Sequence, residues 1–220
     1  KIANNHMGDR RHGQKLIKQL GDVVDQHAEV FDFGLKFQFR DLNSFIHPDH
    51  KGSSVKYVKR FEETQLSNED WSSLFESVKA AKLSLLATPF DEFSVEKCVE
   101  QNVDYIKIAS ACALDFNLHE RAIRNKIPKI ISTGGLTLKD IDKIVSFYSK
   151  KNQKFAIMHC VAIYPSANSE LNIAFIETLK KRYPNIPIGW STHESPDEFN
   201  PSILAYSKGA RIFEKHIGIN

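Results

Sequence analysis

Several features are missing from this sequence of 220 residues, and each absence excludes a class of protein. No apolar run approaches the roughly 20 residues that a helix needs to span a bilayer, and the amino terminus lacks a signal-peptide pattern. The three cysteines show no CxxC spacing, and an odd number argues against a disulfide framework. We therefore expect a cytoplasmic protein that does not enter a membrane.

The sequence also lacks a strong charge of either sign. Its net charge is +3, and Lys and Arg are interleaved with Asp and Glu. A protein that binds nucleic acid usually carries a concentrated basic face, so we expect no nucleic-acid partner. Low-complexity tracts and Gly/Ser linkers are absent as well, so residues 1–220 are expected to form one domain.

Short apolar runs alternate with amphipathic segments along the chain. A helix is predicted over residues 67–82, because a Ser–Asn–Glu–Asp cap precedes Trp71, Leu74, Phe75 and Val78 on one face. Further helices are predicted at residues 136–151, 172–184 and 197–209. The apolar runs predict eight strands, ending near Asn4, Gln38, Thr88, Ser110, Ser132, His159, Ser191 and His216.

This alternation predicts an α/β fold of parallel strands joined by crossover helices. Eight strands favour a closed (β/α)8 TIM barrel, because closure removes the exposed edges of an open sheet. An open doubly wound sheet is the alternative, but no GxGxxG turn follows any predicted strand. The chain ends just after the eighth predicted strand, so we expect the last helix to be missing and the chain to be a truncated barrel.

Polar residues gather at the carboxyl ends of the predicted strands, where a barrel of this kind has its active site. Strand alternation turns Lys36 and Gln38 inward, opposite the apolar side that meets the helices. Strand ends also collect polar residues without any function, because they adjoin solvent. The convergence of ammonium and hydroxyl groups nevertheless indicates a small, highly charged anion, held by Lys36, Thr88, Lys107, Ser110, Ser132 and Ser191.

Two histidines, His193 and His216, follow neighbouring predicted strands, which run about 4.8 Å apart. Imidazoles at that spacing can share one divalent metal and leave coordination positions for water or substrate. A single histidine at a strand end, such as His159, is more often structural. Glu214 lies on the same predicted face as His216 and is expected to orient it, whereas Lys215 points the other way.

Eight motifs in this order resemble those of the sialic acid synthase (N-acetylneuraminate synthase) family: IANNHMGD, LKFQFRD, ATPFDE, YIKIAS, ISTGG, MHCVAIYP, GWSTHE and EKHIG. The resemblance implies a transferase whose (β/α)8 barrel precedes a small antifreeze-like domain, which we expect to be absent from this chain. It implies condensation of phosphoenolpyruvate with an N-acetylated sugar aldehyde, giving phosphate and a nine-carbon 2-keto acid such as sialic acid. It further implies a divalent metal, commonly Mn²⁺ but also Mg²⁺, and a homodimer.

The same resemblance implies roles for individual residues. The anion-binding set above matches positions that hold phosphoenolpyruvate, and Gln38 and Tyr164 match positions near the sugar. His193 and His216 match the two metal ligands, and the metal polarises the open-chain aldehyde. No residue is assigned as a catalytic acid or base.

Three positions depart from the family pattern. Lys1 and Cys112 each stand where sugar-handling members have Glu, and Ala162 replaces an Asn that helps to bind the anion. Loss of two carboxylates weakens the assignment of the sugar more than that of the barrel or the metal. These departures imply a divergent subgroup whose acceptor differs from N-acetylmannosamine, with legionaminic or pseudaminic acid precursors as alternatives.

Two other interpretations remain open from the residues. A related aldol-type barrel could act on another aldehyde, with Lys107 forming a Schiff base if it lies desolvated in the barrel. Alternatively, the barrel could have lost catalysis and only bind a sugar acid or a partner protein, for which Lys1 and Cys112 are the support.

Overall fold

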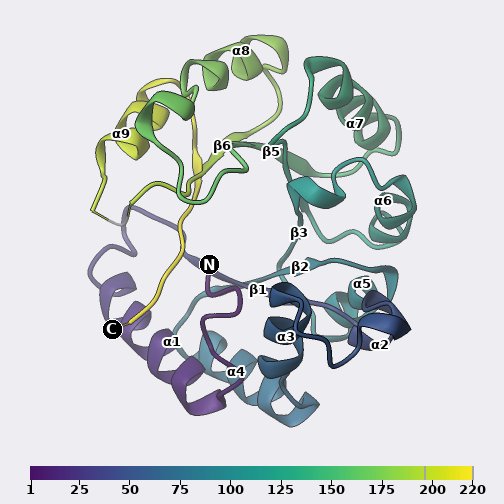
Figure 1. Ribbon diagram of the computed structural model, residues 1–220. Coiled ribbons are helices and arrows are strands. Elements are labelled where there is room, and N and C mark those ends of the chain that lie inside the picture. Colours follow the sequence, from purple (N-terminus) through teal and green to yellow (C-terminus); the bar gives the residue numbers. More distant parts are fainter. Residues whose placement is uncertain (196, 220) are drawn as a thin grey trace. The chain divides into compact units, whose positions relative to one another are not determined.

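The computed structural model describes residues 1–195 and 197–219, in which helices alternate with strands (Figure 1). The strands are β1 Gly34–Phe39, β2 Ser84–Pro89, β3 Tyr105–Ile108, β4 Lys129–Ser132, β5 Phe155–Cys160, β6 Ile188–Ser191 and β7 Ile212–Glu214. The α-helices are α1 Arg10–Val24, α2 Leu42–Phe45, α3 Lys56–Glu63, α4 Asn68–Ala80, α5 Glu92–Glu100, α6 Phe116–Ala122, α7 Leu138–Lys150, α8 Ala174–Arg182 and α9 Asn200–Ser207. Short 3-10 helices are η1 Pro48–His50, η2 Ser110–Cys112 and η3 Asn168–Glu170.

The chain divides into two compact units. The first contains Lys1–Tyr105 and the chain from Ile217 onward, and the second contains Ile106–His216. The division passes through β3, so that each unit has parallel strands, a core and candidate site residues of its own.

In the first unit, β1 pairs in parallel with β2 and packs against α4. The ring of Phe37 meets the ring of Trp71 edge-on at 5.5 Å and that of Phe75 at 5.6 Å. This contact confirms the predicted apolar side of the strand. The helix predicted over 67–82 is also confirmed, and the Ser67 side chain caps it by accepting from the amide of Asp70.

In the second unit, each strand from β3 to β7 pairs in parallel with the next one along the chain. Helices α6 to α9 lie along one side of these strands (Figure 1). Apolar side chains of α7, α8 and α9 pack there on β5 and β6 around Trp190, which is fully buried. The predicted helices at 136–151, 172–184 and 197–209 correspond to α7, α8 and α9, and α7 begins with a capping box between Thr137 and Asp140.

The prediction of a strand that ends near Asn4 is wrong. The amide of Ile2 donates to the carbonyl of Lys36 in β1 at 3.0 Å, but the chain then turns instead of extending a ladder. Ala3 has a φ of 49°, and the amide of Asn5 bonds back to the carbonyl of Ile2 at 2.8 Å. The described residues therefore contain seven strands rather than eight, in an α/β architecture of parallel strands.

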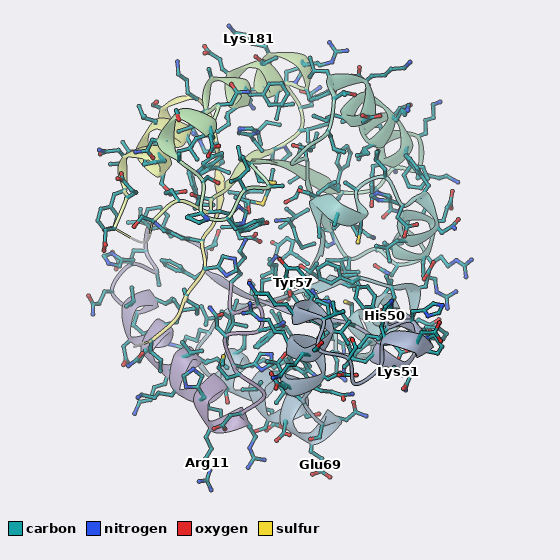
Figure 2. All side chains as sticks on the ribbon, in the orientation of Figure 1. Arg11, His50, Lys51, Tyr57, Glu69 and Lys181 are labelled. Atoms are coloured by element: carbon teal, nitrogen blue, oxygen red, sulfur yellow. The ribbon has the colours of Figure 1, made fainter. Side chains whose placement is uncertain are left out.

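Charged side chains of both signs project from the helices of each unit. Arg11 of α1, Glu69 of α4 and Lys181 of α8 project outward (Figure 2). Within the part of the chain that the structure describes, no helix combines the length and the apolar character needed to cross a bilayer.

Candidate active site

In the second unit, a buried ion pair joins β3 to β7. Lys107 is 2% exposed, and its ammonium donates to Glu214 Oε2 at 3.1 Å. Ser191, at the end of β6, donates through its hydroxyl to the other oxygen, Oε1, at 2.9 Å. The Lys107 ammonium also contacts the sulfur of Met158 at 3.3 Å, and its third N–H has no partner among the described residues. Glu214 thus holds two of the predicted anion-binding groups in place.

A second group of contacts fixes Ser110, the first residue of η2. The amide of Gly134 donates to Ser110 Oγ at 3.0 Å, and Cys160 Sγ lies 3.1 Å from the same oxygen. A Cβ on Gly134 would lie 2.8 Å from the Cys160 sulfur and 2.9 Å from the Ser110 hydroxyl. Only glycine therefore fits at this close approach. The Gly134 amide donates to Ser110 Oγ, and the Cys160 thiol can donate to the same oxygen. With both donors directed at the oxygen, the hydroxyl hydrogen of Ser110 remains available to an acceptor such as an anion.

The two predicted metal ligands are brought together in the second unit. The rings of His193 and His216 lie 5.9 Å apart, and the ring of Tyr164 lies 4.2 Å from that of His193. All three residues line a cavity of about 260 Å³. The structure thus places one residue expected near the sugar beside the residues expected at the metal.

The His193 side chain has the hydrogen bonding expected of a metal ligand. Its Nδ1 lies 3.1 Å from the carbonyl oxygen of Val161, which can only accept. Nδ1 therefore carries a proton, and in the neutral form of the ring Nε2 carries the lone pair that a metal requires. Residues 1–195 and 197–219 contain no cluster of three or more His, Cys, Asp or Glu side chains arranged for a metal. The only ligand set that the described residues offer here is the imidazole pair of His193 and His216, which would leave the other coordination positions to water or substrate.

Glu214, the last residue of β7, bonds to Lys107 and Ser191, two contacts that the sequence did not predict. Its expected role in orienting His216 stays a prediction. Lys215 does point elsewhere, as expected: its ammonium donates to the carbonyl of Glu198 at 3.0 Å.

Other predicted anion-binding residues lie in the first unit or at the end of β4. Lys36 is buried in β1, Ser132 is buried at the end of β4, and Gln38 stands opposite Thr88 in the β1–β2 register. The Thr88 hydroxyl is buried and has no hydrogen-bond partner among the described residues. Since buried hydroxyls usually have a partner, this one keeps hydrogen-bonding capacity for a ligand or a water molecule, as do buried polar atoms of Trp190 and Thr192.

The first unit also contains a cavity of about 400 Å³ beside the end of β1. Its lining combines amide side chains with aromatic walls and includes Asn4, Gln38, Asn68, His6, Trp71, Phe61, Arg40 and Lys97. His6 packs edge-on against Trp71 at 5.5 Å and accepts through Nδ1 from the amide of Gly8 at 3.1 Å. Burial, and secondarily the charge of His12, lowers the pKa of His6 to about 4, so that its ring is neutral at pH 7.

Acidification is expected to destabilise the protein through His6. As the pH falls below 6.5, the unfolded chain takes up a proton that the folded ring accepts only near pH 4, so stability is lost across this window. Relative to pH 7, the loss attributable to His6 at pH 5 should be about 1 to 2 kcal/mol. Urea unfolding at both pH values should show this loss reduced in His6→Asn, which keeps an acceptor for Gly8. The exposed His27→Asn is the control, and an equal pH dependence in all three proteins would contradict the assignment.

Sequence reasoning did not find two features of these sites. Cys160 was not linked to Ser110, because the two lie 50 residues apart in the chain. Arg40 was also missed, although it continues the alternation that starts at Lys36 and Gln38 and so belongs to the same side of the strand. That alternation was the signal that could have revealed it.

The chain is similar in sequence to a known protein family and to its members. A family model described as the NeuB family matches residues 31–220. The chain is 30% identical over 223 residues to an N-acetylneuraminate-9-phosphate synthase of Drosophila melanogaster, an alignment that covers 100% of the chain and 59% of that relative. The chain therefore spans less than two thirds of the length of this relative.

Solved structures also match along the whole chain. A protein of Chromobacterium violaceum, described as a spore coat polysaccharide biosynthesis protein E, aligns with a TM-score of 0.94 and 44% identity, covering 100% of this chain and 65% of that one. The N-acetylneuraminic acid synthetase of Leptospira borgpetersenii serovar Hardjo-bovis, solved in complex with citrate, aligns with a TM-score of 0.86 and 29% identity, covering 100% and 72%.

Proposed function

Since the chain belongs to the NeuB family, we propose that the protein condenses phosphoenolpyruvate with an N-acetylated sugar aldehyde. The products are phosphate and a nine-carbon 2-keto sugar acid, either sialic acid or a related nonulosonate. Relatives described as synthases of N-acetylneuraminate 9-phosphate, pseudaminic acid and diacetyllegionaminic acid support this reaction class.

The buried cluster of Lys107, Glu214 and Ser191 is the observation that carries this proposal. A buried ammonium next to a hydroxyl is a site for an anion, and the remaining N–H of Lys107 is available to one. Glu214 offsets the charge of Lys107 before the anion arrives and keeps the ammonium in position. The single hydroxyl proton of Ser191 is donated to Glu214, so Ser191 holds the carboxylate in place rather than donating to the anion in this arrangement. The phosphate or carboxylate of phosphoenolpyruvate has acceptor oxygens suited to the remaining N–H of Lys107. Ser110 and Ser132 are the further residues of the second unit that we assign to the same substrate. Lys36 and Thr88, in the first unit, stay sequence-based predictions for phosphoenolpyruvate.

The reaction balances with one water molecule. The methylene carbon of phosphoenolpyruvate, C3, forms a bond to the aldehyde carbon of the sugar, and the aldehyde oxygen takes up a proton. Water then adds to C2, the carbon that carries the phosphate, and releases the proton that balances the one taken up. The bond between C2 and the phosphate oxygen breaks, which leaves the 2-keto group and phosphate. The lysine and serine side chains orient the anion, which contributes to the rate as much as their charge does.

A divalent metal, most simply Mn²⁺, would be held by His193 and His216 and would polarise the sugar aldehyde. The Val161 carbonyl keeps Nε2 of His193 unprotonated for this purpose. Tyr164 lies against the His193 ring, where it would limit how the sugar approaches.

The acceptor is proposed as an N-acetylated aldose other than N-acetylmannosamine. Cys112 ends η2 and is only partly buried, so a thiol occupies the position where a carboxylate would contact the sugar. Ala162 is exposed and offers no side-chain donor to the anion.

Phosphate release tests this proposal. The protein with its native termini, supplied with phosphoenolpyruvate, Mn²⁺ and a panel of N-acetylated aldoses, should release phosphate only when an acceptor is present. Absence of release with every acceptor, despite measurable ligand binding, would favour a barrel that binds a sugar acid without catalysis.

The geometry offers little support for a Schiff-base aldolase. A lysine nucleophile has to be a neutral amine, whereas Lys107 is paired with the Glu214 carboxylate. Borohydride treatment with pyruvate should therefore leave Lys107 unmodified, and a stable adduct at this residue would reverse the assignment.

Cys160 is expected to affect phosphoenolpyruvate binding through Ser110. Cys160→Ala should raise KM for phosphoenolpyruvate several-fold, because the serine hydroxyl loses one of its two partners. Cys160→Ser should preserve it, since a hydroxyl can donate in the same place. The buried Cys98 has no place in this group, so Cys98→Ala is the control for loss of a buried thiol. An unchanged KM in Cys160→Ala would show that the contact does not orient Ser110.

A further inference from the structure

Arg40, the residue that follows β1, is enclosed by aromatic rings in the first unit. Its guanidinium carbon lies 3.9 Å from the ring centre of Phe90, 4.2 Å from that of Phe61 and 5.8 Å from that of Phe45. These rings come from three segments: the chain after β2, helix α3 and helix α2. Stacked cations of this kind are attracted to the aromatic faces, so the plane of the guanidinium is fixed.

The fixed guanidinium in turn fixes the amide of Gln38. Arg40 Nη2 donates to Gln38 Oε1 at 3.0 Å. A guanidinium has only donors, so the Gln38 atom that faces it has to be the oxygen. The orientation of this amide is therefore determined by chemistry, and its NH₂ group is turned away from Arg40.

Gln38 and Arg40 both line the cavity of about 400 Å³ described above. The amides of Asn4 and Asn68 and the neutral ring of His6 line it too, together with the apolar rings of Trp71 and Phe61. The charged side chains of Asp41 and Lys97 line it as well, one of each sign. Amide groups beside aromatic surfaces suit a polar ligand that has both hydrogen-bonding groups and an apolar part. A sugar carrying an acylamino group has this chemistry, with a carbonyl oxygen that needs a donor and a methyl group that needs an apolar surface.

We propose that Arg40 is a positioning residue for the acceptor: it makes Gln38 an obligate hydrogen-bond donor to the acylamino carbonyl of the sugar in this cavity. The inference rests on the proposed function, because that function supplies the acceptor. It adds a residue outside the sequence-predicted site and a specific reason for preferring N-acylated sugars. Arg40 itself does not touch the reacting atoms.

Two variants test this role in the protein with its native termini. Arg40→Met removes the donor that orients Gln38 and should raise KM for the N-acetylated acceptor about tenfold, the size expected for one hydrogen bond, while KM for phosphoenolpyruvate stays unchanged. Arg211→Met is the matched control, because Arg211 also stacks on an aromatic ring, that of Tyr206 at 4.6 Å, but lies outside the cavity.

The second variant, Gln38→Glu, distinguishes loss of the donor to the sugar from loss of protein stability. Its carboxylate would pair with Arg40 and should keep or raise the thermal unfolding temperature, yet it has no NH₂ group to donate. We expect the same increase in acceptor KM, and both variants should lose most of the preference for N-acetylated over non-acetylated aldoses. An unchanged acceptor KM in Gln38→Glu would overturn the inference, as would a parallel rise in both KM values in a folded Arg40→Met protein.

Calorimetry with the N-acetylated aldose keeps the inference separate from the proposed function. If the unmodified protein shows no turnover but binds the aldose, the proposed reaction fails, and weaker binding in both variants would still support the role of Arg40. Equal binding in all three proteins would overturn that role. If the unmodified protein neither turns over nor binds the aldose, both proposals fall.

Discussion

Lys107→Met should reduce turnover by about 10²- to 10³-fold, because it removes the buried ammonium that we assign to phosphoenolpyruvate. The same substitution leaves the Glu214 carboxylate buried without its cation. Removing one partner of a buried ion pair typically costs about 3 to 5 kcal/mol, so the free energy of unfolding should also fall steeply. Steady-state kinetics and urea unfolding measure the two effects on the same preparation.

A double substitution distinguishes the two roles of the ion pair. Lys107→Met combined with Glu214→Gln removes both charges and keeps an amide beside Ser191, so most of the lost stability should return. Turnover should remain low, because the donor to the anion is still missing. If turnover returned together with stability, Lys107 would be a structural residue, and the anion site would have to be assigned elsewhere.

His193→Ala should abolish metal binding at the imidazole pair and reduce turnover by at least about 10²-fold. Loss of one of two protein ligands leaves His216 alone, and a single imidazole holds a divalent ion weakly. Electron paramagnetic resonance of Mn²⁺ added to the protein gives the fraction bound without any need for activity.

Substitutions at His50 and Val161 are the controls for the loss of Mn²⁺ binding in His193→Ala. His50→Ala removes an exposed imidazole of the first unit and should leave Mn²⁺ binding unchanged. Since the contact to His193 comes from the Val161 carbonyl, substituting the Val161 side chain should likewise have little effect. Undiminished Mn²⁺ binding by His193→Ala would contradict the assignment of the metal site.

The parts of the fold that repeat were predictable from local patterns. Helix α4 is specified by its Ser67 cap and by four apolar residues on one face, and both features depend only on neighbouring residues. Local patterns could not show that the strand expected near Asn4 is absent. "IAN" looks like a short strand, and the turn is set by the backbone at Ala3 and by bonds within residues 2–9, which composition does not reveal.

The candidate site was predictable where its members lie at strand ends. Strand alternation indicated that Ser191 and Glu214 belong to inward faces, and the β6–β7 register places them opposite each other. Their link to Lys107 was not predictable, because it joins side chains of β3 and β7, two strands that do not pair with each other and lie far apart in the sequence. The stacking of aromatic rings on Arg40 was not predictable either, because the rings come from segments that are separate in the sequence.

The product of the reaction tests the central claim most directly. Phosphoenolpyruvate labelled with ¹³C at all three carbons would be incubated with the native-length protein, Mn²⁺ and N-acetylated aldoses, and the products analysed by mass spectrometry. We predict a 2-keto acid that contains the whole acceptor and all three labelled carbons, formed in equal amount with phosphate. Labelled pyruvate with an unchanged acceptor, or no conversion with any acceptor, would contradict the proposed condensation.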